Sequence, residues 1–286
     1  MPLVSIADLN GPPEEVAACI EQAKALSALY ENYLATEEDK SDRPPGLHAS
    51  EIAGCLRQAV YTLLATEKRS RPSSFWRRKF KMGHAVHEMV QDDFQRLARR
   101  TQATRAAADL ARRRGWRLSF EPEVPIAPHL QPLAARLSVY SKCDGVFTFH
   151  NAWTDEPVLR VGLEIKTQSP GDFEKLKEPV REHLLQTHLY MRCLDLPLMW
   201  LFYFSKGTQN NTESLAPFLV PFDPDVWQEV ETRCLVALEA GARGELPARE
   251  ESIRCDFCPY VWGCQPTRLH PRSAKSSFAL PRATGR

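Results

Sequence analysis

The sequence has no apolar run long enough to cross a membrane. The longest apolar stretch, Leu196 to Phe204, falls well short of the roughly 20 residues that a transmembrane helix needs. The first residues lack the basic start and the apolar core of a secretory signal. No internal repeat is evident. We therefore expect an intracellular, cytoplasmic protein without a membrane partner.

The sequence also lacks an excess of either charge, with 37 Lys and Arg against 36 Asp and Glu among 286 residues. The basic residues are nevertheless concentrated in two runs. These runs comprise Arg69, Arg71, Arg77, Arg78, Lys79 and Lys81, and then Arg96, Arg99, Arg100, Arg105, Arg112, Arg113, Arg114 and Arg117. A basic stripe on a balanced surface favours binding to a phosphate backbone. Arginine-rich helices are also often simply solvated, so the charge pattern alone leaves both interpretations open.

Eight cysteines in a reducing compartment favour metal or cluster ligation over disulfides. Cys255, Cys258 and Cys264 form a C-x2-C-x5-C pattern, in which the third thiol can fold back over the first pair. Three thiolates leave a tetrahedral zinc ion or a cubane cluster one ligand short. Cys55 is the candidate fourth ligand, although a lone helical cysteine is more often a core residue. We interpret the cysteines without such spacing as core or surface thiols: Cys19, Cys143, Cys193 and Cys234.

Two carboxylates and a lysine lie on two successive predicted strands. Residues two apart on a strand share a face, so Glu164 and Lys166 project together while Ile165 points into the core. If the strands pair as a hairpin, Asp144 lies beside Glu164 at an exposed sheet edge. Carboxylate oxygens are ligands that Mg²⁺ prefers, and a lysine can stabilise an attacking hydroxide or a phosphoryl charge. For an isolated Glu-x-Lys, a solvated surface pair is the plainer interpretation.

Hydrophobic periodicity and turn residues predict an α/β chain. Expected helices cover 12–38, 50–64, 80–97, 172–194 and 223–240, and expected strands cover 120–126, 137–149, 159–167, 198–205 and 215–221. The nearly continuous apolar character of 198–205 predicts a central strand. Pro122 and Pro125 suit a strand end or a sheet edge in 120–126.

Taken in order, these features resemble the PD-(D/E)xK nucleases of the RecB type. The chain contains Asp-x19-Glu-x-Lys on successive strands, followed by a helix with Gln186-x-x-x-Tyr190. Cys143 replaces the proline of the family motif, and Gly83-x-x-x-His87 ahead of the strands is similar to the first family motif. The resemblance implies a restriction-endonuclease-like core, with a central mixed sheet flanked by helices.

One cysteine before these motifs and three after them resemble the iron–sulfur branch of the family. This branch includes the AddB nuclease domain and the CRISPR-associated exonucleases, and the Cys55-x-Arg57-x-x-x-Tyr61 segment is similar to the latter. The resemblance covers residues 48–266. It implies a 4Fe–4S cluster, with zinc as the alternative, held by Cys55, Cys255, Cys258 and Cys264.

The resemblance implies a metal-dependent DNA exonuclease, bacterial or phage-encoded, that acts on DNA ends or single strands in recombination, repair, or CRISPR or phage DNA processing. One or two Mg²⁺ or Mn²⁺ ions would be held by His87, Asp144, Glu164 and the backbone carbonyl of Ile165. Catalysis would use the metal-bound carboxylates together with Lys166, Gln186 and Tyr190. DNA contacts would come from Arg57, Arg77, Arg78, Lys79, Arg112, Arg113 and Arg114. A helicase, a recombinase or a CRISPR adaptation protein would be the expected protein partner.

We divide the chain into four parts: an N-terminal helical region (1–78) contributing one cluster cysteine, a nuclease core (79–245), a cysteine segment (246–270), and a basic tail (271–286) that we expect to be disordered. Two alternatives lie outside this interpretation. A catalytically silent nuclease fold could bind DNA ends or a recombination partner, but a degenerate site would usually have lost Asp144, Glu164 or Lys166. A zinc-ribbon nucleic-acid binder would leave the carboxylate–lysine strand unexplained.

Overall fold

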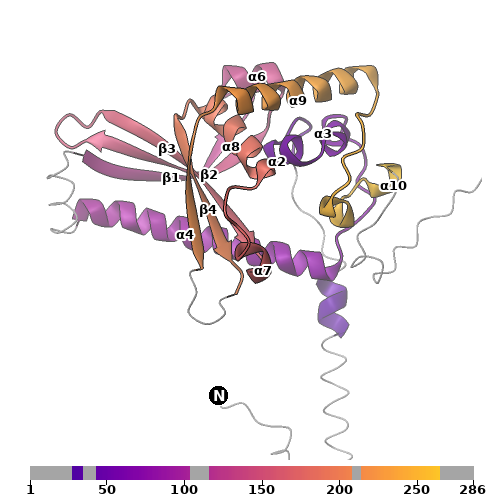
Figure 1. The fold of residues 1–286 in the computed structure, drawn as a ribbon, viewed down its shortest axis with the longest axis horizontal. Coiled ribbons are helices and arrows are strands. Elements are labelled where there is room, and N and C mark those ends of the chain that lie inside the picture. The colour runs from indigo at the N-terminus through magenta and orange to yellow at the C-terminus, as the bar shows by residue number, and fades with distance from the viewer. Residues whose placement is uncertain (1–27, 35–42, 104–115, 208–213, 265–286) are drawn as a thin grey trace, which may run out of the picture.

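A five-stranded mixed sheet forms the centre of the part of the chain that the structure describes (Figure 1). This structure is a computed structural model, and it describes residues 28–34, 43–103, 116–207 and 214–264. The strands lie side by side in chain order: β1 (Trp116–Ile126), β2 (Ser141–Asn151), β3 (Pro157–Gln168), β4 (Leu198–Ser205) and β5 (Leu215–Pro221). β3 and β4 are parallel, whereas the other neighbours are antiparallel.

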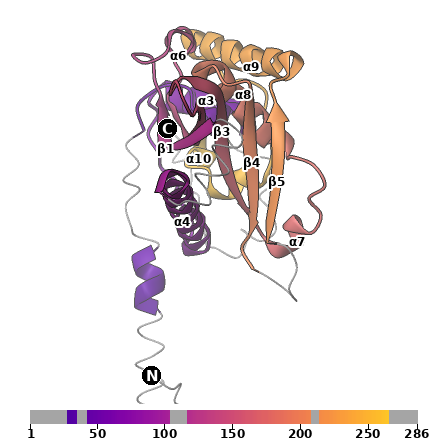
Figure 2. The ribbon, with the colours of Figure 1, turned by 90° about the vertical axis from the view of Figure 1, so that its left-hand side faces the viewer.

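Helices cover both faces of this sheet (Figures 1 and 2). On one face lies α4 (Ser74–Ala103), whose Val90 and Phe94 pack with Phe147 and Ile165 of the sheet. The other face is covered by α8 (Arg181–Leu194) and α9 (Pro224–Arg243), together with α2 (Ala49–Gly54) and α3 (Leu56–Leu63). The expected fold class, a mixed sheet flanked by helices, is therefore confirmed.

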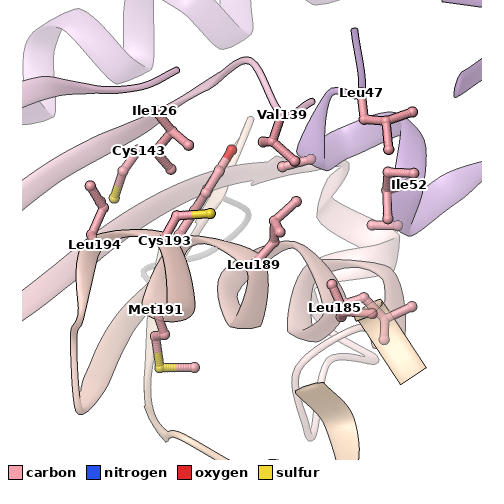
Figure 3. Close-up of a cluster of buried hydrophobic side chains, with 14 of the residues drawn as sticks. Leu47, Ile52, Ile126, Val139, Cys143, Leu185, Leu189, Met191, Cys193 and Leu194 are labelled. Atoms are coloured by element: carbon pink, nitrogen blue, oxygen red, sulfur yellow. The ribbon is translucent and has the colours of Figure 1, made fainter. Parts of the chain in front are cut away.

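The core between α8 and the sheet is made of aliphatic side chains and thiols. Figure 3 shows Leu189 and Cys193 of α8 in the same layer as Cys143 of β2 and Ile52 of α2. Leu189 is fully buried. Because residues spaced by four lie on one side of a helix, this side of α8 faces the core. No helix in the described ranges is both long enough and apolar enough to cross a bilayer.

The shorter elements are α6 (Pro132–Leu137), α7 (Pro170–Phe173), the 3₁₀ helix η2 (Ile253–Phe257) and α10 (Val261–Cys264). Residues 28–34 are helical, and the rest of the helix expected over 12–38 lies outside the described ranges. The tail 271–286 and Cys19 also lie outside them.

Most strand predictions are confirmed. β4 and β5 coincide with the expected 198–205 and 215–221, and β4 lies between β3 and β5 as its apolar sequence predicted. β1 is an edge strand, and its Pro122 and Pro125 are tolerated because an edge leaves some backbone positions without a ladder partner. β1 begins four residues before its expected start at Phe120, at Trp116.

Two predicted helices are interrupted. The helix expected over 50–64 breaks at Cys55, which is extended (φ −156°, ψ 112°) and ends α2 before α3 begins. A carboxylate from the far end of the chain accounts for the break, because Glu250 Oε2 accepts a hydrogen bond from Leu56 N at 2.6 Å. The helix expected over 172–194 is also broken, and its second part starts only at Arg181, after Pro179.

The proposed boundary between residues 78 and 79 falls inside a continuous helix. α4 starts at Ser74 and runs unbroken across this point. The basic residues 77–81 therefore belong to the same rigid element as His87.

Polar and aromatic contacts join the start of the described core to its end. Thr62 Oγ1 donates to Glu51 Oε1 at 3.1 Å and lies 3.2 Å from Tyr260 Oη. The rings of Tyr61 and Tyr260 are stacked with centroids 5.0 Å apart. Segments almost two hundred residues apart are thus held together, as Figure 1 shows for α3 and the yellow C-terminal segment.

The buried Glu51 predicts a specific pH dependence of stability. Burial raises the pKa of Glu51 from its ordinary 4.5 to about 7, although Arg43 and Thr62 oppose the shift. The folded protein therefore retains a proton that the unfolded chain releases, so this contribution to stability is full below pH 4.5 and is lost as the pH rises to about 7.

We expect Glu51→Gln to be more stable than the parent by about 1 kcal/mol or more above neutral pH, and close to it in acid. Urea unfolding of both proteins across this pH range measures the difference. Glu239→Gln, in an exposed ion pair of α9, serves as the control. A difference that does not change with pH would contradict the prediction.

Candidate active site and cysteine cavity

The predicted catalytic strands form a fork inside the sheet. The ladder between β2 and β3 ends at the pair Gly145–Leu163, while Glu164 continues to pair with β4. At this point Asp144 Oδ2 accepts a hydrogen bond from Ile165 N at 2.7 Å. The hairpin and the proximity of its two carboxylates are as expected. The expected position at an exposed sheet edge is wrong, because Glu164 lies on an interior strand and is only 2% exposed.

A chain of polar contacts leads from Glu164 into α8. Lys166 Nζ lies 2.5 Å from Glu164 Oε1 and donates to Gln186 Oε1 at 2.8 Å. Gln186 Nε2 donates in turn to Tyr190 Oη at 2.7 Å. Gln186 and Tyr190 are both buried, one turn apart on α8. The Gln186–Tyr190 pair is therefore positioned to orient the ammonium group of Lys166.

His87 reaches the fork from α4. Its Nδ1 lies 3.3 Å from Asp144 Oδ1. One turn further on, Gln91 Nε2 donates to the backbone oxygen of Asp144 at 2.8 Å and to Glu123 Oε1 at 2.9 Å. Gln91 was not among the predicted site residues, and its four-residue spacing from His87 is the signal that could have identified it. A methyl group added at Gly83 would lie 3.5 Å from Thr167 Oγ1, which is an ordinary contact distance. The packing of α4 against β3 therefore does not require a glycine at this position.

The fork has an unbalanced negative charge. Burial and the neighbouring Asp144 raise the pKa of Glu164, and Lys166 offsets only part of this effect. Burial lowers the pKa of His87, but Asp144 and Glu164 outweigh it, so the net shift is upward. Glu164 Oε2 is buried without a hydrogen-bond partner. An orphaned buried carboxylate oxygen beside a second carboxylate and an imidazole fits a divalent cation.

The ligands are not yet arranged around one point. Within the described ranges, no three His, Cys, Asp or Glu side chains are set closely enough to hold a single metal ion as they stand. Asp144 is engaged by His87 and Ile165 N, and Glu164 Oε1 is engaged by Lys166. Binding of a cation would therefore require these carboxylates to exchange partners.

Four cysteines line one cavity. Cys55 comes from the junction of α2 and α3, and the others come from η2, the turn after it, and α10: Cys255, Cys258 and Cys264. Burial and the three neighbouring thiols raise the pKa of Cys258 to about 12, although a backbone hydrogen bond opposes the shift. Four thiolates are the donor set of a tetrahedral metal ion or a cubane cluster, but as they stand no three of these thiols are set closely enough to hold a single ion. Ligation would therefore require the four side chains to move together.

Two arginines expected to contact DNA are instead turned inward. Arg57 is half-buried, with Nε donating to Pro247 O at 2.6 Å and Nη1 donating to Cys264 Sγ at 3.8 Å. Arg77 is only 8% exposed, and its Nε donates to Pro72 O at 3.3 Å. These side chains support the local structure and are not part of a free basic surface.

The remaining predicted DNA contacts have different surroundings. Arg78 forms an ion pair with Glu31 at the surface. The ammonium of Lys79 lies over the rings of Phe75 and Trp76. Three further arginines, Arg112, Arg113 and Arg114, lie outside the described ranges.

No protein-family model matches the chain, and no curated protein matches it. Solved structures do show some likeness. SSO0001 is 13% identical, with a TM-score of 0.45, and the match covers 87% of this chain and 98% of that one.

An alkaline exonuclease (LHK-Exo) from Laribacter hongkongensis is 12% identical, with a TM-score of 0.44, over 71% of this chain and 90% of that one. The complex of LHK-Exo with dAMP gives 13% identity and a TM-score of 0.39, over 70% and 90%. A likeness of this degree assigns neither a family nor an activity to the chain.

Proposed function

We propose that the protein is a metal-dependent deoxyribonuclease that hydrolyses DNA from free ends or in single-stranded regions. The observation that carries this proposal is the fork. There Asp144 contacts His87, while Lys166 contacts Glu164 and donates to Gln186. Four elements contribute to it: α4, β2, β3 and α8. A silent scaffold has no need to bury a carboxylate with an unsatisfied oxygen, because such a group costs stability.

The metal would be held by His87, Asp144, Glu164 and the backbone carbonyl of Ile165. When bound, Mg²⁺ or Mn²⁺ supplies an activated water and offsets the charge of the phosphate. Lys166 stabilises the negative charge that develops on the phosphoryl oxygens. Gln186 holds the Lys166 ammonium in place, and Tyr190 holds Gln186. Pre-organised contacts of this kind would hold the ammonium of Lys166 in the orientation that faces the scissile phosphate.

We further propose that the cysteine cavity holds a 4Fe–4S cluster with a structural role, zinc being the alternative. Its support is a set of four thiols, drawn from both ends of the described core, that line one cavity. Iron analysis and the visible absorption of anaerobically purified protein distinguish the two groups. A helicase, a recombinase or a CRISPR adaptation protein stays the expected partner by resemblance alone.

The proposed function is tested by incubating the iron-replete protein with Mg²⁺ or Mn²⁺ and three DNA substrates: end-labelled linear single strands, linear duplexes and closed circles. We expect linear DNA to be shortened, closed circles to be spared, and EDTA to stop the reaction. A protein that binds DNA ends but cleaves no substrate with either metal would support the scaffold instead.

A further inference from the structure

One face of α4 continues beyond the end of the sheet. Residues spaced by three or four along the helix lie on this face: Trp76, Phe80, Gly83, His87, Val90 and Phe94. Val90 and Phe94 pack in the core, and His87 contacts Asp144. Gly83 passes Thr167 near the end of β3. Trp76 and Phe80 therefore extend the line of the catalytic residues past the sheet.

Aromatic rings cluster where this face meets the cysteine segment. The ring centroid of Phe257 lies 4.7 Å from that of Trp76 and 5.3 Å from that of Phe80. Phe75 packs edge-on against Trp76 at 5.4 Å, and Lys79 Nζ lies 4.7 Å from the Phe75 centroid and 4.8 Å from that of Trp76. We call these five residues the α4 platform: Phe75, Trp76, Lys79, Phe80 and Phe257.

The platform differs from an ordinary core cluster in its exposure and its charge. Phe75 and Phe80 are 44% and 38% exposed, although both rings contact other aromatic groups. A second ammonium lies close by, because Lys206 Nζ donates to Lys79 O at 3.3 Å. Exposed rings interleaved with ammonium groups suit bases that stack and phosphates that carry the balancing charge.

We propose that the α4 platform stacks the bases of a single-stranded DNA segment that leads to the fork, an inference that rests on the proposed nuclease function. The distance along α4 between the platform and the fork is compatible with this path of the DNA strand. Phe80 precedes His87 by seven residues, which at 1.5 Å per residue is about 10 Å along the axis. At the spacing of stacked bases, about 3.4 Å, this distance corresponds to roughly three nucleotides. The strand would thus cross the platform before reaching the catalytic residues.

The platform also gives the cysteine segment a role in substrate binding. Phe257 lies between Cys255 and Cys258, so ligation of these thiols would fix the position of its ring. In the same segment of the chain, the ring centroid of Trp262 lies 4.4 Å from the guanidinium of Arg69. A cluster at this place would organise a DNA-binding surface without entering the chemistry.

The test is a binding measurement on the full-length, iron-replete protein in EDTA, so that no cleavage occurs. Two fluorescently labelled probes are used, a short oligothymidylate and an abasic strand of the same length. Binding of each probe is measured by fluorescence anisotropy. We expect the double variant Phe75→Leu/Phe80→Leu, which keeps apolar bulk but loses both π faces, to bind oligothymidylate at least fivefold more weakly. Its affinity for the abasic strand should be unchanged.

Two matched variants complete the test. Phe75→Tyr/Phe80→Tyr retains both rings and should keep the parent affinity. Trp153→Leu removes a ring that is 76% exposed on the β2–β3 connection and should also leave affinity unchanged. The stacking proposal would be refuted if the leucine variant bound oligothymidylate as tightly as the parent does. It would also be refuted if the variant lost as much affinity for the abasic strand as for oligothymidylate.

The outcomes separate this inference from the proposed function. An active nuclease whose leucine variant binds normally would refute the platform and leave the function standing. Base-dependent binding that is lost in the leucine variant, in a protein without nuclease activity, would support the platform and refute the function.

Discussion

Lys166→Ala is expected to reduce DNA cleavage by on the order of a hundredfold or more, with the fold retained. Two physical effects combine in this variant. The ammonium that stabilises the phosphoryl charge is removed, and Glu164 loses the group that lies 2.5 Å from its Oε1. The pKa of Glu164, already raised by burial and by Asp144, would then rise further. A protonated Glu164 is a poor metal ligand, so the loss should exceed that of the lysine charge alone.

Glu164→Gln and Asp144→Asn isolate the carboxylate charges while preserving side-chain shape. Each should lower cleavage to a similar extent, because an amide is a weaker ligand for a hard cation. Removing the buried charge of Glu164 should leave the melting temperature unchanged or raise it, since its Oε2 has no hydrogen-bond partner. Glu239→Gln, which alters an exposed ion pair of α9, should cleave at the parent rate.

These measurements need single-turnover rates and melting curves on the same preparations. Normal cleavage by Lys166→Ala would remove the fork as the active site. Loss of cleavage together with a collapsed melting transition would assign the lysine to stability, with no demonstrated part in the chemistry.

If the cysteine cavity holds the proposed metal group, Cys55→Ala is expected to remove it and to destabilise the protein about as strongly as Cys258→Ala. The two cysteines lie about two hundred residues apart in sequence, yet both line one cavity. Ligation that joins such distant residues restricts the unfolded chain as a long-range disulfide does, an effect of about 4 to 5 kcal/mol for long loops. Iron content, visible absorption and thermal unfolding report the loss.

The structure also explains why activity should fall in these variants, although no cysteine takes part in the proposed chemistry. Arg254, next to Cys255, donates from Nε and Nη2 to Glu182 Oε2 at 2.9 and 2.7 Å. Glu182 is one turn ahead of Gln186 on α8, which holds Lys166. Disorder of the cysteine segment would therefore release one end of the helix that holds Lys166, the proposed catalytic lysine.

Matched controls come from the core. Cys193 and Cys234 are buried outside the cavity, so Cys193→Ala and Cys234→Ala should retain metal and colour. A Cys55→Ala protein with full iron content and normal melting would show that another residue supplies the fourth ligand. The chemical link between the two ends of the described core would then be lost.

The sequence by itself determined the mixed strand-and-helix order and, apart from Gln91, the residues that meet at the fork. Strand alternation and helical spacing are local properties of the sequence. They can therefore be recognised without knowing which elements pack against each other. A two-residue period placed Glu164 and Lys166 on one side of a strand. The resemblance of Asp-x19-Glu-x-Lys to the PD-(D/E)xK motif then singled them out together with Asp144. The pairing of Gln186 and Tyr190 followed equally from a four-residue helical spacing.

Only the tertiary structure decided how these residues are buried and paired. Glu164 is buried because its strand lies between β2 and β4 with helices on both faces, which no local period reveals. The break at Cys55 coincides with a hydrogen bond that Leu56 N donates to the carboxylate of Glu250, almost two hundred residues away. The inward turn of Arg57 depends on the backbone oxygen of Pro247. Long-range contacts of this kind set burial and electrostatics, whereas the sequence pattern sets only which side chains share a face.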